Sequence, residues 1–138
     1  MKRLFFIAIA GVVFFSLGCD PDKKAEKYFI EGNQKFKQND FKGAEAFYDK
    51  AIKAKPDYAE AYKQRGRARY NQKETKEALN DFTKAIEFDK NMAEAYYNRG
   101  TIYFYMNDVE NACKDFRKAK ELKYPYVDDN YKICNYYN

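Results

Sequence analysis

The chain contains no histidine among its 138 residues. This absence excludes Ser-His-Asp and Cys-His nucleophiles, histidine general bases and histidine-ligated zinc sites. Glycine is also scarce, with six residues in all, and none of them forms a GxGxxG or GxxxxGK loop. The common nucleotide-binding loops are therefore missing. The sequence indicates a protein that is not an enzyme, with no catalytic residues, no cofactor and no small-molecule substrate.

Cysteine is scarce as well, and the excess of positive over negative charge is small. Only three cysteines are present, and one of them lies at the end of an N-terminal apolar segment. Two remaining cysteines without any histidine do not predict a metal site. The formal net charge is +5, and the lysines alternate with acidic residues, as in Asp49-Lys50, so that no basic stripe is formed. This pattern argues against a nucleic-acid partner.

One apolar run stands at the start of the chain. Lys2-Arg3 precedes an uncharged, mostly apolar stretch over residues 4–17, which ends in Gly18-Cys19. The stretch is shorter than the roughly 20 residues that a membrane-spanning helix needs. A basic start, a short apolar core and a small residue at the break are typical of a secretory signal. Residues 1–18 are therefore predicted to be a signal peptide.

The sequence Ser16-Leu17-Gly18-Cys19 resembles the lipobox of bacterial lipoproteins. This resemblance implies that the Cys19 thiol carries acyl chains, palmitate among them, and two or three chains make a durable anchor. It further implies export to a membrane of the bacterial cell envelope, with residues 19–24 as a short tether. The inner and the outer membrane both remain open. The alternative is an ordinary signal peptide or an uncleaved anchor in which the cysteine is incidental.

A set of small residues recurs three times at an interval of 34 residues. Its members are Gly32, Ala44 and Ala51; Gly66, Ala78 and Ala85; and Gly100, Ala112 and Ala119. An internal period of roughly 20 to 50 residues indicates stacked repeats. Aromatics recur with the same period at the positions of Tyr28 and Tyr48. Their spacings of three and four from the small residues place them on one helix face, so each unit is predicted to hold two amphipathic helices.

This order of aromatic, glycine, alanine, aromatic and alanine resembles the tetratricopeptide repeat family. The resemblance implies an all-α, right-handed α-solenoid of three helix-turn-helix repeats and a C-terminal capping helix. The expected units are residues 25–58, 59–92, 93–126 and, for the capping helix, 127–138. The family usually has a large apolar residue before its glycine, whereas this chain has Glu31, Arg65 and Arg99. We expect these departures to weaken the edges of units two and three.

The two other cysteines lie near the C-terminus. Cys113 is expected on the second helix of unit three and Cys134 on the capping helix, which has apolar residues at approximately helical spacing. An array of repeats needs such a cover over its last apolar face. After export both thiols meet an oxidising compartment, which allows a disulfide between them. The alternative is a pair of buried, unpaired thiols.

The family resemblance implies that the first helices of the units line a concave groove, which binds a protein or peptide. The candidate groove residues are Phe29, Asn33, Lys63, Arg67, Tyr97, Asn98, Thr101 and Tyr105. Three further aromatics on this side, Phe36, Tyr70 and Phe104, are expected to serve interhelical packing. Some family members bind carboxyl-terminal chaperone tails with a clamp of basic and asparagine side chains. Phe29, Gln64 and Glu94 occupy clamp positions here, so that specificity is not implied.

Together these features predict a lipid-anchored adaptor or scaffold that binds protein in the bacterial cell envelope. The competing interpretation is a structural envelope lipoprotein that self-associates through its exposed aromatics and has no distinct client.

Overall fold

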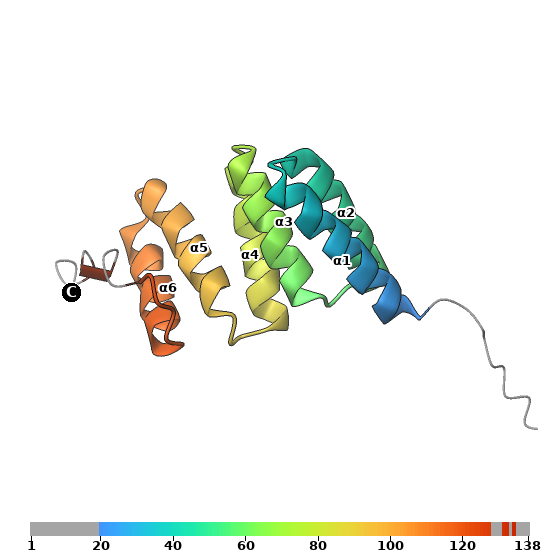
Figure 1. Cartoon of the computed structure of the whole chain (residues 1–138). Helices are drawn as coiled ribbons and strands as arrows, with labels where there is room; N and C mark the ends of the chain where they lie inside the picture. Colours follow the sequence, from blue (N-terminus) through green and yellow to red (C-terminus); the bar gives the residue numbers. More distant parts are fainter. Residues whose placement is uncertain (1–19, 128–130, 133, 135–138) are drawn as a thin grey trace, which may run out of the picture.

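Three antiparallel helical hairpins stand side by side along the chain (Figure 1). The structure is a computed structural model that describes residues 20–127, 131, 132 and 134. It contains α1 (Pro21–Lys37), α2 (Phe41–Ala54), α3 (Ala59–Asn71), α4 (Thr75–Phe88), α5 (Ala93–Tyr105) and α6 (Val109–Glu121). No strand occurs in that part of the chain. The predicted all-α repeat fold is confirmed.

Each helix packs mainly against its neighbours in the chain, and α1 also touches α3. The first helices of the second and third hairpins, α3 and α5, begin at Ala59 and Ala93, which are the first residues of the predicted units. The first hairpin differs, because α1 begins at Pro21 and Asp20 caps it by accepting a hydrogen bond from the Asp22 amide at 3.1 Å. Residues 21–24, which were predicted to belong to a short membrane-proximal tether over residues 19–24, are therefore the first turn of α1. None of the helices within the described residues has the length and apolar character of a membrane span.

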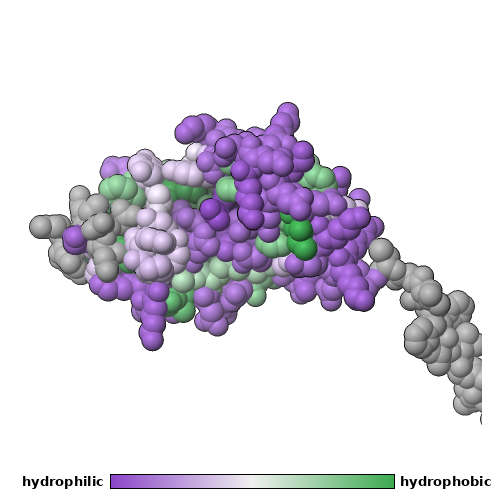
Figure 2. Space-filling model, in the orientation of Figure 1, coloured by the Kyte–Doolittle hydropathy of each residue, from purple (hydrophilic) through white to green (hydrophobic). Residues whose placement is uncertain are grey.

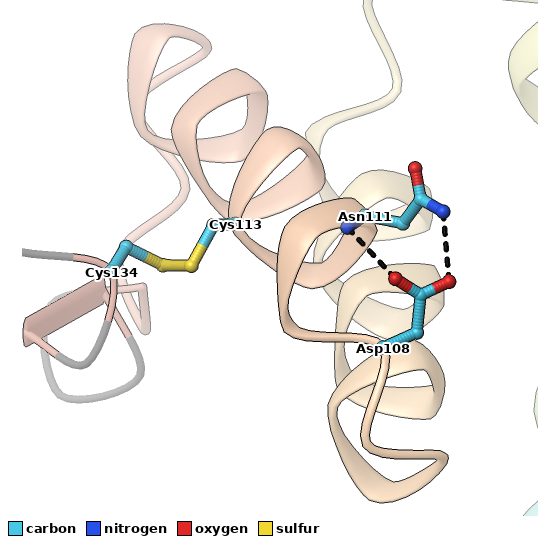
Figure 3. Close-up of a disulfide and its surroundings, with 4 residues drawn as sticks. All are labelled: Asp108, Asn111, Cys113 and Cys134. Carbon is cyan, nitrogen blue, oxygen red and sulfur yellow. Dashed lines mark hydrogen bonds between the residues drawn. A yellow bond between two sulfur atoms is a disulfide. The ribbon is translucent and has the colours of Figure 1, made fainter. Parts of the chain in front are cut away.

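The turn inside each hairpin carries one residue in the left-handed backbone region. Asn39, Lys73 and Asn107 have φ values of 60°, 69° and 61°, and they follow one another at intervals of 34 residues. Aspartate side chains then cap the N-termini of two of the second helices, α2 and α6. The Asp40 carboxylate accepts from the Gly43 amide at 2.9 Å, and Asp108 accepts from the Asn111 amide at 3.2 Å (Figure 3). Asparagine tolerates the left-handed region better than most residues, which favours the turn at two of the three sites.

The core of each hairpin is a glycine on the first helix that faces an aromatic ring on the second. A Cβ atom added to Gly66 meets the ring of Phe82 at 3.1 Å, and one added to Gly100 meets Phe116 at 3.0 Å. The corresponding rings Tyr48, Phe82 and Phe116 are 0%, 1% and 1% exposed. The three glycines and six alanines of the predicted packing set are all buried. Small residues allow the two helix axes to approach, and the ring fills the space beside them.

Buried ion pairs join the two helices of the second and third hairpins at the positions where the family usually has an apolar residue, and each arginine also reaches the preceding hairpin. The guanidinium of Arg65 donates two hydrogen bonds to the Asp81 carboxylate, at 2.9 and 2.6 Å, and a third to Asp49 of the preceding hairpin at 2.7 Å. Burial alone lowers the pKa of Arg65, but the hydrogen bond and charge of Asp81 outweigh it, and the pKa is raised. The expected weak edge of unit two is instead a charge-paired contact.

Unit three repeats this arrangement. Arg99 donates to both oxygens of Asp115 at 2.8 Å, and to the Thr83 hydroxyl of the preceding hairpin at 3.3 Å. Thr83 lies 34 residues after Asp49, so each arginine spans the same three helices. Unit one has Glu31 in place of the arginine. The arginine-centred contact is therefore specific to the second and third hairpins.

The last hairpin is covered by residues that follow α6. Val127, Tyr131 and Cys134 pack in one cluster with Phe116 and Cys113. Cys113 and Cys134 are joined by a disulfide (Figure 3). Residues 128–130, 133 and 135–138 of the predicted capping helix lie outside the described residues. The three hydrophobic clusters of the described residues, with the rings packed against them, extend from Phe29 to Cys134. A fragment that begins at Asp20 keeps every one of these core contacts, and we therefore expect it to fold on its own.

Replacing both Cys113 and Cys134 by alanine is expected to lower the free energy of unfolding by about 3 kcal/mol, because the bridge closes a loop of 21 residues in the unfolded chain. Urea denaturation of the oxidised protein and the variant measures this difference. Reduced wild-type protein is the control and should unfold at nearly the same urea concentration as the variant. Free thiols on both cysteines in the untreated protein, seen by mass spectrometry, contradict the prediction.

Candidate functional site

The eight predicted groove residues come from α1, α3 and α5, and the structure separates them into two groups. Phe29 and Asn33 of α1 take part in packing within the molecule. The Phe29 ring lies 5.1 Å from the Tyr58 ring and 5.9 Å from the Tyr48 ring, between centroids. The Asn33 side-chain oxygen accepts a hydrogen bond from the Tyr48 hydroxyl at 2.8 Å. Both side chains therefore help to fix the first hairpin.

Lys63 and Arg67 of α3 are paired with acidic side chains. Lys63 is 7% exposed, and its ammonium lies 2.7 Å from both the Glu60 and the Glu94 carboxylates. Arg67 reaches the other oxygen of Glu94 at 3.3 Å and lies over the Phe36 ring at 5.1 Å. Glu60 and Glu94 together balance the two cations, and this part of the surface carries no unpaired positive charge.

A hollow lies between α3 and α5, and we call it the α3–α5 hollow. Its volume is about 100 Å³, and it is open to solvent. The residues that line it are Arg67, Tyr70, Asn71, Phe82, Asn98 and Thr101. Three predicted groove residues therefore come together here. Tyr70 was expected to serve packing only, but it is 37% exposed and contributes a wall of the hollow.

The amide of Asn98 is the unusual feature of this hollow. Its Nδ2 atom is buried and has no hydrogen-bond partner among the residues that the structure describes. The neighbouring polar groups are satisfied locally, since Thr101 donates to the Tyr97 carbonyl at 2.9 Å and Asn71 donates to the Arg67 carbonyl at 2.8 Å. A buried donor without an acceptor costs about 1–3 kcal/mol. Asn98 therefore combines a place in the lining of the hollow with a donor that no described residue satisfies.

The remaining candidates, Tyr97 and Tyr105, lie in different surroundings. The Tyr97 ring packs against Tyr124 at 4.9 Å and against Phe116 at 5.9 Å. Tyr105 is 73% exposed, and the centroid of its ring lies 6.0 Å from that of the Phe104 ring. Tyr105 is thus available to a partner at the end of α5, whereas Tyr97 supports the C-terminal cluster.

Sequence reasoning missed one residue of the hollow. Phe82 of α4 forms part of its lining, although α4 is a second helix and was not expected to reach the groove. The repeat pattern identified Phe82 only as the core ring that packs against Gly66, and no sequence signal placed it beside the groove. The described residues contain no cluster of three acidic, cysteine or histidine side chains arranged for a metal ion.

Comparison with known repeats agrees with this geometry. A family profile described as a TPR repeat matches residues 66–107, and one described as a tetratricopeptide repeat matches residues 25–58 and 93–125. The chain has no match among curated proteins.

Solved structures are similar over most of the chain. The first TPR domain of Spaghetti (RPAP3), bound to the HSP90 peptide SRMEEVD, is 26% identical with a TM-score of 0.77, covering 80% of this chain and 90% of that one. The Arabidopsis OM64 TPR domain is 27% identical with a TM-score of 0.80, covering 86% and 100%. The TPR2B domain of yeast Sti1, in a pHsp70 complex, is 26% identical with a TM-score of 0.76, covering 84% and 99%. With its three matched repeats, this chain belongs to the tetratricopeptide repeat family.

Proposed function

We propose that this protein is a non-catalytic adaptor, anchored by lipid in the bacterial cell envelope, which binds an extended peptide segment of another protein in the α3–α5 hollow. The observation that carries the proposal is the buried Asn98 amide without an acceptor. A peptide backbone carbonyl is an acceptor of the right kind, and an extended segment presents one at every residue. Binding then removes the cost of the unsatisfied donor.

The walls of the hollow suit a peptide that is not strongly acidic. Tyr70 supplies exposed aromatic surface, with the buried Phe82 ring behind it, which favours an apolar side chain of the ligand. Glu94 already pairs with Lys63 and Arg67, so a ligand carboxylate meets no unpaired cation there and is repelled by Glu94 itself. The similar domains bound to chaperone peptides support peptide binding as a mode. They do not indicate that the ligand of this chain is an acidic tail.

The lipid anchor is supported by the sequence before the helices. The lipobox-like residues end at Cys19, directly before the Asp20 cap of α1. A repeat domain attached at this point stays close to the membrane surface, and its partners are proteins that reach that surface.

Peptides selected from a random-sequence phage library on the folded domain test the groove. Asn98→Ala is expected to lower the affinity for the best peptide about 10-fold, because it removes the hydrogen bond that the buried Asn98 amide donates to the peptide. Isothermal titration calorimetry measures the affinities of wild type and variant. The peptide SRMEEVD serves as a second probe and should bind more weakly than the selected peptide.

The matched control is Asn80→Ala, which truncates an exposed asparagine on α4 and should leave affinity unchanged. Helical circular dichroism checks that both variants fold. Equal affinity of wild type and Asn98→Ala for every selected peptide rejects the α3–α5 hollow as the binding site.

A further inference from the structure

A cluster of lysines surrounds the start of α1 and the end of α2, and we call it the N-terminal basic face. Its members are Lys23, Lys24, Lys27, Lys50 and Lys53, grouped around Tyr28. Two open hollows of about 490 and 450 Å³ lie on this face, and both are lined by Lys24 and Tyr28. The helices run antiparallel, so the basic beginning of α1 meets the basic end of α2 (Figure 1). Figure 2 shows hydrophilic side chains over this end of the molecule.

The acidic residues nearby are committed to other contacts. Asp22 pairs with Lys55 at 3.1 Å, Glu26 accepts the hydrogen bond of the Tyr58 hydroxyl, and Asp20 caps α1. Among the described residues, Asp20 is the one acidic residue that lines these two hollows, and Glu26 and Glu31 line a third hollow beside Lys23 and Lys27. The five lysines outnumber these three carboxylates, so the face keeps a local excess of positive charge that the overall balance of the chain conceals.

Four of the lysines have no carboxylate partner within the described residues, namely Lys23, Lys24, Lys27 and Lys53. All four are exposed. The fifth, Lys50, lies over the Phe47 ring at 4.7 Å and the Tyr28 ring at 5.8 Å. Lys84 and Lys114 of the later hairpins, by contrast, are each paired with a glutamate one turn away. The unpaired lysines are thus available to an external anion.

The position of this face in the chain indicates what the anion is. The apolar run over residues 4–17 and Cys19 precede Asp20 directly, and α1 begins at the next residue. Whatever holds Cys19 at a bilayer also holds the first turn of α1 within a few residues of the headgroups. Tyrosine is enriched at that level of the membrane because its ring is amphipathic, and Tyr28 lies at the centre of the lysines.

We propose that the N-terminal basic face lies on the anionic phospholipid headgroups of the membrane that carries the anchor. The inference extends the proposed adaptor function, since it depends on the domain being held at a membrane. The lysines attract the negatively charged surface, and each contributes about fivefold to the partition coefficient. The contact fixes the orientation of the solenoid, with α1 and the end of α2 at the bilayer.

Vesicle flotation of the fragment of residues 20–138, which lacks Cys19, tests this contact without the lipid anchor. The fragment is expected to bind vesicles of an equal mixture of phosphatidylcholine and phosphatidylglycerol on the order of 100-fold more tightly than vesicles of phosphatidylcholine alone. The variant with Lys23→Gln, Lys24→Gln, Lys27→Gln and Lys53→Gln should lose this preference. High salt should weaken wild-type binding because exposed charges are screened.

The matched control carries Lys42→Gln, Lys73→Gln, Lys76→Gln and Lys90→Gln. It removes the same charge from exposed lysines in the turns between helices and in the first turns of α2 and α4, and it should keep the preference for phosphatidylglycerol. Equal loss in both variants, or no preference in the wild-type fragment, overturns the proposal; the second result points to an acidic protein as the ligand of this face. The anchor is tested separately, by fatty-acid labelling of the full chain and of Cys19→Ala.

Discussion

Asp81→Ala is expected to lower the free energy of unfolding by about 4 kcal/mol. The Asp81 carboxylate is completely buried and accepts hydrogen bonds from Arg65 and Arg69, whose side chains are 14% and 18% exposed. Without it, two largely buried guanidinium groups lose a partner, and the cost of a buried charge without its counter-ion is large. Urea denaturation followed by circular dichroism measures the change.

The control for Asp81 is Glu110→Ala, which removes an exposed ion pair with Lys114 and should cost less than about 0.5 kcal/mol. Asp115→Ala should fall between the two, because Asp115 pairs with the single arginine Arg99. If Asp81→Ala costs no more than Glu110→Ala, the buried network does not hold the second hairpin together.

Phe116→Ala should destabilise the protein by about 4 kcal/mol through the cavity that it leaves. The ring is 1% exposed, lies against Gly100 and belongs to the cluster that contains the disulfide. The glycine cannot fill the space from the other helix, and the bridge restrains the collapse of the surrounding chain. Thermal or urea unfolding of the oxidised variant measures the loss.

Phe88→Ala is the matched control for this core substitution. Phe88 is 46% exposed and contacts the Tyr62 ring at 5.5 Å, so its removal should cost about 1 kcal/mol. Similar losses for the two phenylalanines contradict the assignment of Phe116 to the core of the last hairpin.

The architecture could be predicted from the sequence because its cause is local and repeated. Gly66 and Phe82 lie on facing helices, and the period of 34 residues brings an equivalent pair to each hairpin. The start of α1 was predicted less well. Asp20 and Pro21 form a cap and a first helical position, and these signals extend the helix beyond the repeat period.

The candidate site was predicted only in part, because its residues depend on contacts between units. Position on the helix pointed to Arg67, Asn98 and Thr101, and the structure brings these three residues together in the lining of the α3–α5 hollow. It could not reveal that Glu94 neutralises Lys63, since this pair joins residues 31 positions apart and has no counterpart in the repeat pattern. The unsatisfied amide of Asn98 likewise appears only once the surrounding side chains are placed.

Packing between consecutive helices also affects how the molecule is made. Since α2 meets α3 and α4 meets α5 with few contacts at longer range, each pair of helices can form soon after it leaves the ribosome. The first pair needs nothing from the last to become structured. The disulfide between Cys113 and Cys134 can form only after Cys134 has been synthesised and both thiols have been oxidised, so the final hairpin gains its full stability last.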